Sequence, residues 1–409
     1  MVTGDFSLTA AAIARQVGIF TAEHVDKATD LVVVKREMSL VVDDGENSAR
    51  RALLLSGTDL PDLTDPQWEM VTNYDEIVFA RTTPEQKLRI VQEFQKRGNI
   101  VGVTGDGVND APALKAANIG IAMGGGSEVA MEAAHMVLLD NNFSSIIVAI
   151  ENGRLVYDNL KKVILYLLPA GSWSELIPIL VNVLLGVPLP LSAFLMIYIC
   201  VLTDMLPSIA IMFETPESDL LKRPPRRPNQ DRLVNLGLLR HAYLFTGLME
   251  TLFSHCMFFY YIQSTAHISA SEILLTFDKW TAGYKGMTQE QLDDLQFTGQ
   301  SVTFVSLVVL QAFGNLLATR TRRLSIFQHP PWALPSRNLW LLGAQFGSIV
   351  LALIAVYLPA FHNIFNTRPV PVKFWFIPLG GAMIILGADE IRKYFVRKYP
   401  QGTLAKLSW

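Results

Sequence analysis

The sequence is poor in cysteine and in charged residues, and each shortage excludes a class of protein. Only Cys200 and Cys256 occur among 409 residues, and both lie within apolar runs. Two such cysteines cannot build a disulfide framework, and neither their spacing nor their neighbours indicate a metal site. Charged residues make up 17% of the chain and the net charge is −3, so a nucleic-acid partner is not expected.

What the chain has instead is long apolar runs. Hydrophobic residues make up half of the sequence, but their distribution is uneven. Residues 1–160 have the composition of a soluble domain, whereas 161–409 are dominated by apolar stretches. We therefore expect an α/β domain with a link to the membrane over 1–160, and a helical membrane domain over 161–409.

Short apolar segments bounded by turn residues recur through the first part. Such segments are typical of buried parallel strands, and they lie at Ala52–Leu55, Ile77–Ala80, Ile100–Val103, Ile119–Ala122 and Met136–Leu139. Helices are predicted at Thr9–Val17, Pro84–Arg97, Pro112–Ala117 and 141–160, whereas residues 23–48 indicate no particular structure. The alternation of strands and helices predicts a Rossmann-like, doubly wound α/β sheet.

Six apolar runs follow, and each is about long enough to cross a bilayer core of about 30 Å. They cover residues 163–186, 190–213, 236–263, 299–319, 338–359 and 373–389. Any single run has the alternative of being a buried core helix. Six in series predict an all-α bundle of six transmembrane helices in contact with membrane lipid.

Lysine and arginine cluster after the second, fourth and sixth apolar runs. The clusters are Lys222, Arg223, Arg226, Arg227 and Arg232; Arg320, Arg322 and Arg323; and Arg392, Lys393, Arg397 and Lys398. Basic segments beside membrane spans stay on the cytoplasmic side. We therefore expect residues 1–160 and the C-terminus in the cytoplasm, and the acidic segment 264–298 on the opposite side.

The stretch Val101–Pro112 reads as a buried strand that stops at an acidic, glycine-containing turn. Asp106 and Asp110 bring two carboxylates to the carboxyl end of a parallel sheet, where α/β folds bind ligands. Together with Asn109 they form an all-oxygen set suited to Mg²⁺. The alternative is an ordinary turn rich in Asp, Gly and Asn, which the length of the TGDGVNDAP string disfavours.

This string resembles the hinge motif of the P-type ATPases, pumps that phosphorylate themselves on aspartate. Met1–Asp5 resembles the family's TGD segment, and Ala80–Lys87 resembles its conserved-lysine segment. Pro188–Pro190 and Thr203–Pro207 resemble its ion-site helices. The similarity runs over essentially the whole chain and is greatest to the sodium/potassium-type group. It implies a haloacid dehalogenase-type fold for the first part.

The resemblance assigns roles in phosphoryl transfer to several residues. It implies that Asp106 is a direct Mg²⁺ ligand, that Asp110 shapes the site, and that Lys87 meets a phosphoryl oxygen of the ATP-derived group. Thr3 and Gly4 would donate hydrogen bonds to the same group, with Asp5 structural or close to the nucleotide. The family's Asp-Lys-Thr-Gly-Thr segment, which carries the phosphorylated aspartate, is absent from this sequence. We therefore expect this chain by itself not to hydrolyse ATP, and expect the N-terminal half of a pump as its partner.

Two carboxylates in the apolar runs are candidates for binding a transported cation. Ionisable residues within a span are costly and usually functional. Glu175 lies between two prolines in the first run, and Asp204 precedes Pro207 in the second. Prolines free helical carbonyls that can bind a cation beside a carboxylate. Candidate neutral ligands are Ser172, Ser174, Asn182 and Thr203, with Gln311 and Asn315 weaker.

The alternative for these acids is a structural pairing, and Glu250 in the third run also reads as a helix-end residue. The chain departs from the sodium/potassium-type pattern at several positions. Cys200 and Gly314 stand where those pumps carry Asp, and Gly347-Ser348 replaces a Glu pair. Fewer carboxylates predict fewer cations or a different cation.

Three classes of function remain open. The leading one is the C-terminal half of a P-type pump for Na⁺ and/or K⁺ in the plasma membrane, with a possible accessory subunit; H⁺ and Ca²⁺ are alternative cargoes. The second is a stand-alone phosphatase of the haloacid dehalogenase type, which leaves the apolar runs unexplained. The third is a truncated, non-catalytic membrane protein that regulates or assembles with an intact pump.

Overall fold

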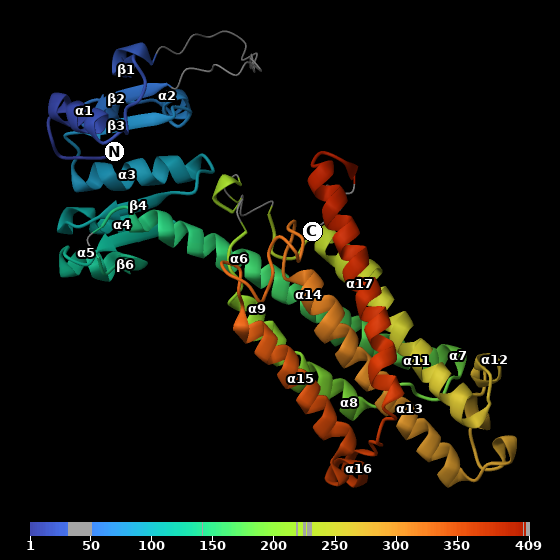
Figure 1. Cartoon of the computed structure of the whole chain (residues 1–409). Coiled ribbons are helices and arrows are strands. Elements are labelled where there is room, and N and C mark those ends of the chain that lie inside the picture. The colour runs from blue at the N-terminus through green and yellow to red at the C-terminus, as the bar shows by residue number, and fades with distance from the viewer. Residues whose placement is uncertain are drawn as a thin grey trace. The chain divides into compact units, whose positions relative to one another are not determined.

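The computed structural model describes residues 1–31, 51–140, 142–217, 220–223, 226, 231–403 and 405. They form two compact units, Met1–Ala149 and Ile150–Trp409, which are coloured from blue to red along the chain in Figure 1. The division falls within one long helix, α6 (Ser145–Leu168). Each unit has its own hydrophobic cores.

The first unit alternates strands with helices, as the apolar spacing predicts. Its strands are β1 (Val25–Lys27), β2 (Ala52–Ser56), β3 (Glu76–Ala80), β4 (Gly102–Gly105), β5 (Ile119–Met123) and β6 (Met136–Leu138). Its helices are α1 (Ser7–Gln16), α2 (Asp65–Val71), α3 (Pro84–Lys96), α4 (Ala111–Ala116) and α5 (Glu128–Ala133). Strand β1 was not expected, because it lies in the charged segment 23–48. Residues 32–48 of that segment lie outside the described residues.

The strands form two separate parallel sheets, whereas the sequence predicts one doubly wound sheet. Strands β1, β2 and β3 pair in that order, and β4, β5 and β6 pair in theirs. The second edge of β3 is taken by the start of the chain, where Val2 forms a parallel bridge with Phe79. Strand β4 pairs only with β5 among the described residues. Each sheet is thus parallel and helix-covered, but the single continuous sheet is not confirmed.

The second unit is built from helices. They are α6, α7 (Ser174–Leu185), α8 (Ala193–Tyr198), α9 (Met205–Met212), α10 (Leu236–Arg240), α11 (Leu248–Ala266), α12 (Ala270–Ile273), α13 (Gln289–Leu310), α14 (Leu316–Thr319), α15 (Leu339–Tyr357), α16 (Pro359–Phe365) and α17 (Lys373–Lys398). Helices α11, α13 and α17 run side by side (Figure 1). The largest hydrophobic core of the chain lies in this unit.

Among the described residues, five helical stretches are long and apolar enough to cross a membrane. They are Ser145–Leu185, Ala193–Met212, Gln289–Thr319, Leu339–Tyr357 and Lys373–Lys398. The remaining expected run, 236–263, also folds as continuous helix from Leu236 to Ala266, but it is not one of these five. It carries Arg240, His241, Glu250 and His255, which lower its hydropathy. Five of the six expected spans are therefore supported.

Four of the six expected spans contain a π-helical segment, in which the turns widen. The segments are η4 (Pro169–Trp173), η5 (Ile199–Thr203), η7 (His241–Gly247) and η10 (Gln311–Asn315). Pro169 explains the first, since proline removes a backbone donor and disturbs the preceding turn. Such widened turns often lie at functional sites, and they free backbone carbonyls.

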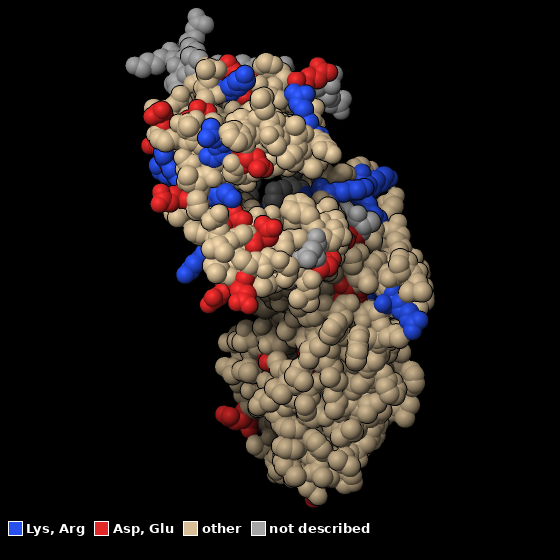
Figure 2. Space-filling view, turned by 90° about the vertical axis from the view of Figure 1, so that its left-hand side faces the viewer, with Lys and Arg blue, Asp and Glu red and all other residues tan. Residues whose placement is uncertain are grey.

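The three basic clusters of the sequence meet at one end of the second unit. Glu217, after α9, accepts hydrogen bonds from the backbone N–H groups of Arg322 (2.8 Å) and Arg323 (3.2 Å). The side chain of Arg397, near the end of α17, donates to the carbonyl of Arg323. Much of the remaining surface of this unit is nearly free of Lys and Arg on the face shown in Figure 2. A charged end beside an apolar surface is the pattern that a membrane-embedded bundle requires.

Candidate functional site

The acidic turn follows directly from strand β4, which ends at Gly105. The turn continues through a short 3₁₀ segment, Val108–Asp110, into α4. A Cβ at Gly105 would lie 2.6 Å from the Cβ of Asp110, so only glycine permits this close approach. The Oδ2 of Asp110 accepts a hydrogen bond from the N–H of Gly107 at 3.3 Å. The glycines therefore fold the turn so that Asp110 points back toward the strand end.

Lys87 is held beside this turn by the first turn of α3. The hydroxyl of Thr83 accepts from the N–H of Gln86 (3.3 Å), and the Gln86 side chain accepts from the N–H of Thr83 (3.0 Å). This reciprocal cap fixes the start of the helix. The Nζ of Lys87 then lies 2.7 Å from Oδ1 of Asp110, and each side chain is 17% exposed. A lysine that is largely buried but still reaches solvent at this position suits the binding of a phosphoryl oxygen.

Asp106 and Asn109 are exposed at the carboxyl end of β4. The side chain of Asp106 makes no hydrogen bond or ion pair within the described part of the chain, whereas Asp110 is neutralised by Lys87. These side chains fit Mg²⁺, which takes one or two protein carboxylates together with water and phosphate oxygens. The described residues hold no group of three or more His, Cys, Asp or Glu side chains that could bind a metal alone.

The Thr3-Gly4-Asp5 segment lies along the outer edge of β3. The N–H of Thr3 donates to Phe79 at 2.9 Å, and its carbonyl accepts from the N–H of Thr82 at 3.0 Å. The Thr3 hydroxyl donates to Asp5 at 3.0 Å. Within the described ranges, no hydrogen bond or ion pair joins Thr3, Gly4 or Asp5 to the acidic turn. The structure thus brings Lys87 and Asp110 together, and holds the TGD segment on the other sheet.

In the second unit, Glu175 and Asp204 lie beside two facing π-helical segments. The Sγ of Cys200 donates to Oε1 of Glu175 at 3.0 Å. Gly171 packs against the same thiol, since a Cβ at this position would lie 3.2 Å from the sulfur. Asp204 is 2% exposed, and its Oδ1 accepts from the hydroxyl of Tyr166 at 3.3 Å. Asp204 is therefore buried within the apolar helices, whereas Glu175 beside the facing π-helical segment is only partly buried.

The neutral side chains proposed as cation ligands form hydrogen bonds away from the two carboxylates. Thr203 donates its hydroxyl to the carbonyl of Ile199 (3.1 Å), so its side chain is committed to its own helix. The amide of Asn182 donates to the carbonyl of Val187 (2.7 Å) at the end of α7. Ser172 has a long contact of 3.5 Å with the hydroxyl of Tyr243. Within the described part of the chain, no side-chain hydrogen bond joins any of these three residues to the carboxylate of Glu175 or Asp204.

A further acid within the apolar helices, Glu250, was undervalued by sequence reasoning. Glu250 is fully buried in α11, and its Oε2 accepts from the amide of Gln311 at 3.0 Å. The amide of Asn315 in turn donates to Oε1 of Gln311 (2.9 Å) and to the carbonyl of Tyr166 (3.1 Å). Because Tyr166 also reaches Asp204, polar contacts link the two acids across four helical stretches. The signal available in the sequence was the i,i+4 spacing of Gln311 and Asn315 in one apolar run.

These features define a class: a multi-pass membrane protein that carries a haloacid dehalogenase-like domain. The family model of the haloacid dehalogenase-like hydrolases matches residues 86–150. The family model described as cation transporting ATPase, C-terminus, matches residues 188–395. The chain belongs to the P-type cation-transporting ATPases.

Curated relatives agree with this membership. The chain is 40% identical over 411 residues to the potassium-transporting ATPase alpha chain 2 of Cavia porcellus. This alignment covers 98% of the present chain and 39% of the relative. It is 38% identical over 416 residues to the sodium/potassium-transporting ATPase subunit alpha-2 of Gallus gallus, with 99% and 40% covered. The chain spans about two fifths of the length of these relatives.

Proposed function

We propose that this chain forms the C-terminal half of a pump that couples ATP hydrolysis, through a phosphorylated aspartate, to the transport of monovalent cations. Na⁺ and/or K⁺ are the cargo that the names of its relatives favour. The observation that carries the proposal is the 2.7 Å contact between Lys87 and Asp110 next to the exposed carboxylate of Asp106. Phosphoryl transfer depends on such positioning and charge neutralisation.

In this proposal, Lys87 binds a phosphoryl oxygen, while Asp110 and Asn109 hold the turn beside Asp106. Asp106 holds Mg²⁺, which when bound neutralises negative charge on the transferred phosphoryl group. Thr3, Gly4 and Asp5 bind the same phosphoryl group or the nucleotide from the edge of β3. The binding of ATP and the phosphorylated aspartate are assigned to a pump segment outside this sequence. Unpaired edges at β4 and at the Val2 segment are compatible with a further strand.

Cation binding is assigned to the interior of the second unit. Glu175 and Asp204 are the charged ligands, and Ser172, Asn182 and Thr203 are neutral groups that would need to turn toward them. The position of the two acids beside π-helical turns, with Asp204 buried and Glu175 partly buried, supports this assignment, since widened turns expose carbonyl oxygens. Residues 1–160 and the C-terminus are placed in the cytoplasm, in a plasma-membrane protein with a possible accessory subunit. The meeting of the three basic clusters at one end supports this orientation.

The phosphoryl-transfer half is tested by Asp106→Asn in a polypeptide that contains this chain and the upstream pump segments. The matched control is Asp62→Asn, which removes the same charge from an exposed position in the same unit. We expect phosphoenzyme formation from ATP to fall by about 100-fold or more in Asp106→Asn and to be unchanged in the control. Equal phosphorylation in both variants would refute the assignment.

A second candidate, a non-catalytic membrane protein that assembles with an intact pump, is favoured by one observation. The sequence contains no Asp-Lys-Thr-Gly-Thr segment. Sequencing the 5′ end of the transcript distinguishes the pump from the non-catalytic membrane protein. An in-frame Asp-Lys-Thr-Gly-Thr segment upstream would exclude the non-catalytic function.

The cargo has its own test, because Cys200 and Gly314 stand where sodium/potassium-type pumps carry acids. Ion flux measured in turn with Na⁺, K⁺, H⁺ and Ca²⁺ decides which cation is carried.

A further inference from the structure

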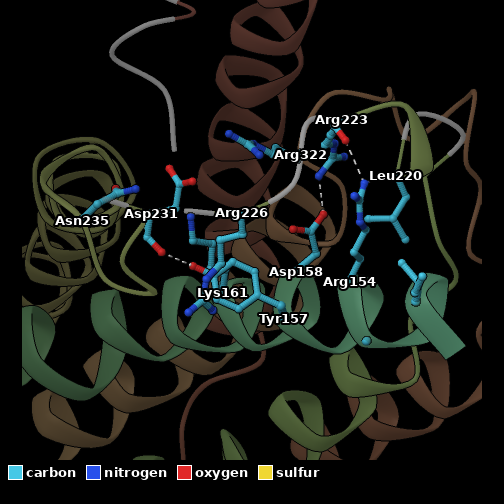
Figure 3. Close-up of a pocket in the computed structure, with 12 residues that line it drawn as sticks. Arg154, Tyr157, Asp158, Lys161, Leu220, Arg223, Arg226, Asp231, Asn235 and Arg322 are labelled. Carbon is cyan, nitrogen blue, oxygen red and sulfur yellow. Dashed lines mark hydrogen bonds and ion pairs between the residues drawn. The ribbon is translucent and has the colours of Figure 1, made fainter. Parts of the chain in front are cut away.

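A pocket of about 480 Å³ lies at the charged end of the second unit, and none of Glu175, Asp204 and Glu250 lines it. Its floor is one face of α6. Its walls among the described residues are Leu220, Arg223, Arg226, Asp231 and Asn235, which lie between α9 and α10, together with Arg322, which follows α14. Figure 3 shows these side chains gathered above α6. The lining side chains that carry charge or stack there are Arg154, Tyr157, Asp158, Lys161, Arg223, Arg226, Asp231 and Arg322.

Positive charge outweighs negative charge in this basic pocket. Five of the described lining residues are Lys or Arg and two are Asp, so the described lining carries an excess of three positive charges. Burial, and then the neighbouring charge of Arg223, lower the pKa of Arg322, as expected where cations crowd together. A concave site with one dominant sign of charge concentrates ions of the opposite sign.

Part of this charge is used to build the pocket. Arg154 donates to the carbonyls of Leu220 (3.1 Å) and Arg223 (2.8 Å), and so holds the connecting segment against α6. Arg223 pairs with Asp158. These contacts make the walls, and they explain why the cations are gathered from distant parts of the sequence.

Two further cations lie against the ring of Tyr157 at the pocket floor. The guanidinium of Arg226 lies 4.6 Å from the ring centroid, and the ammonium of Lys161 lies 5.5 Å from it. The Tyr157 hydroxyl donates to the carbonyl of Asp231 at 2.9 Å, which fixes the ring. Cation–π stacking orients a side chain but leaves its N–H donors available to a ligand.

We propose that this basic pocket binds a phosphomonoester group, presented either by an anionic membrane lipid or by a soluble phosphate. The charge of such a group, about −1.5 to −2 at neutral pH, matches the excess in the pocket. Its three acceptor oxygens match guanidinium and ammonium donors. The apolar run of α6 begins two residues beyond Lys161, so the pocket stands at headgroup depth, where basic sites between spans bind lipid headgroups. The proposal goes beyond the pump function and does not depend on it.

The test uses the full chain, purified in detergent, with lipid binding measured by native mass spectrometry. Phosphatidic acid is the lipid probe and phosphatidylcholine its comparison. Inorganic phosphate, added as a competitor and measured alone by calorimetry, probes the soluble source. We expect phosphatidic acid to bind more tightly than phosphatidylcholine, and Lys161→Gln/Arg226→Gln to weaken its binding by about 30-fold.

The matched control is Lys222→Gln/Arg232→Gln, which removes the same charge from exposed residues near the same segment that do not line the pocket. Its binding should stay close to that of the parent chain. Arg226 is exposed, so Arg226→Gln alone keeps the fold and should weaken binding about fivefold.

Each result either supports one source of the phosphate group or overturns the proposal. Tight binding of phosphatidic acid that inorganic phosphate does not displace supports the lipid source, and binding of inorganic phosphate with no lipid preference supports the soluble source. Equal losses in the two double variants, or no phosphate-dependent binding in either arm, would overturn the proposal.

Discussion

The sharpest prediction concerns Glu214, whose carboxylate is buried just after α9. It lies 2.8–2.9 Å from two nitrogens of the Arg320 guanidinium, which is itself 1% exposed. Asn338 donates to the same carboxylate at 3.1 Å. Arg320 also donates to the carbonyls of His329 and Ser336. One ion pair therefore joins the end of α9, the segment after α14 and the start of α15.

Glu214→Gln keeps the shape of the side chain but removes the charge that balances Arg320. Breaking a buried ion pair on one side costs about 3–5 kcal/mol, because the remaining charge is left uncompensated. The carbonyl contacts of Arg320 persist in the variant, so we expect a loss at the lower end, about 3 kcal/mol. For a unit of this size that loss lowers the midpoint of thermal unfolding by about 6–12 °C.

The assay is the midpoint of thermal aggregation of the detergent-solubilised chain, followed by size-exclusion chromatography. The control is Asp294→Asn, which breaks the 2.6 Å pair with Arg368 at a site where Asp294 is 62% exposed. Exposed pairs contribute about 0–1 kcal/mol, so this midpoint should hardly move. If both variants lost the same small amount, the reasoning about the buried pair would be wrong.

The same pair predicts a dependence on pH. Burial alone would raise the pKa of Glu214, but the hydrogen bond from His329 and the charge of Arg320 outweigh it and leave this pKa below 4.5. The stabilisation from a lowered carboxylate pKa is complete above 4.5 and is lost as the pH falls through the folded-state value. The midpoints of the parent chain and of Glu214→Gln should therefore converge as the pH falls below 4.5.

Four other variants, at three positions, test the sites described above. Gly105→Ala should force the carboxyl group of Asp110 out of place and lower the free energy of unfolding by about 1–3 kcal/mol. Hydrogen exchange in the turn should become faster, and an unchanged exchange rate would contradict the close approach of Gly105 to Asp110. Glu250→Ala should cost about 1–3 kcal/mol because Gln311 loses its buried acceptor, while Glu250→Gln should cost less; equal thermal midpoints would rule out that contact. In a complete pump, Asp204→Asn should weaken cation activation of ATP hydrolysis by about tenfold or more, and unchanged activation would remove Asp204 from the cation site.

Much of the architecture follows from local sequence patterns. The apolar segments at 52–55, 77–80 and 119–122 became β2, β3 and β5 with shifts of about one residue, because a short buried run between turns has few alternatives to a parallel strand. Thr83 and Pro84 likewise marked the start of α3 through a capping pattern that needs no distant partner. The long apolar runs were recognisable since length and hydropathy alone decide whether a helix can cross a bilayer.

Which residues far apart in the sequence come into contact was decided only by the tertiary structure. Lys87 meets Asp110 across 23 residues, and Glu250 meets Gln311 across 61. The division of the strands into two sheets also depends on which edges pair, and the apolar pattern of a strand does not encode that choice. The sequence by itself determined most of the segments that become strands and helices, although not β1, α2 or α5, because propensity, capping and hydropathy act over a few residues. The three-dimensional packing decided which buried acids, amides and cations lie together, because each polar group that leaves water must find a partner wherever the fold places one.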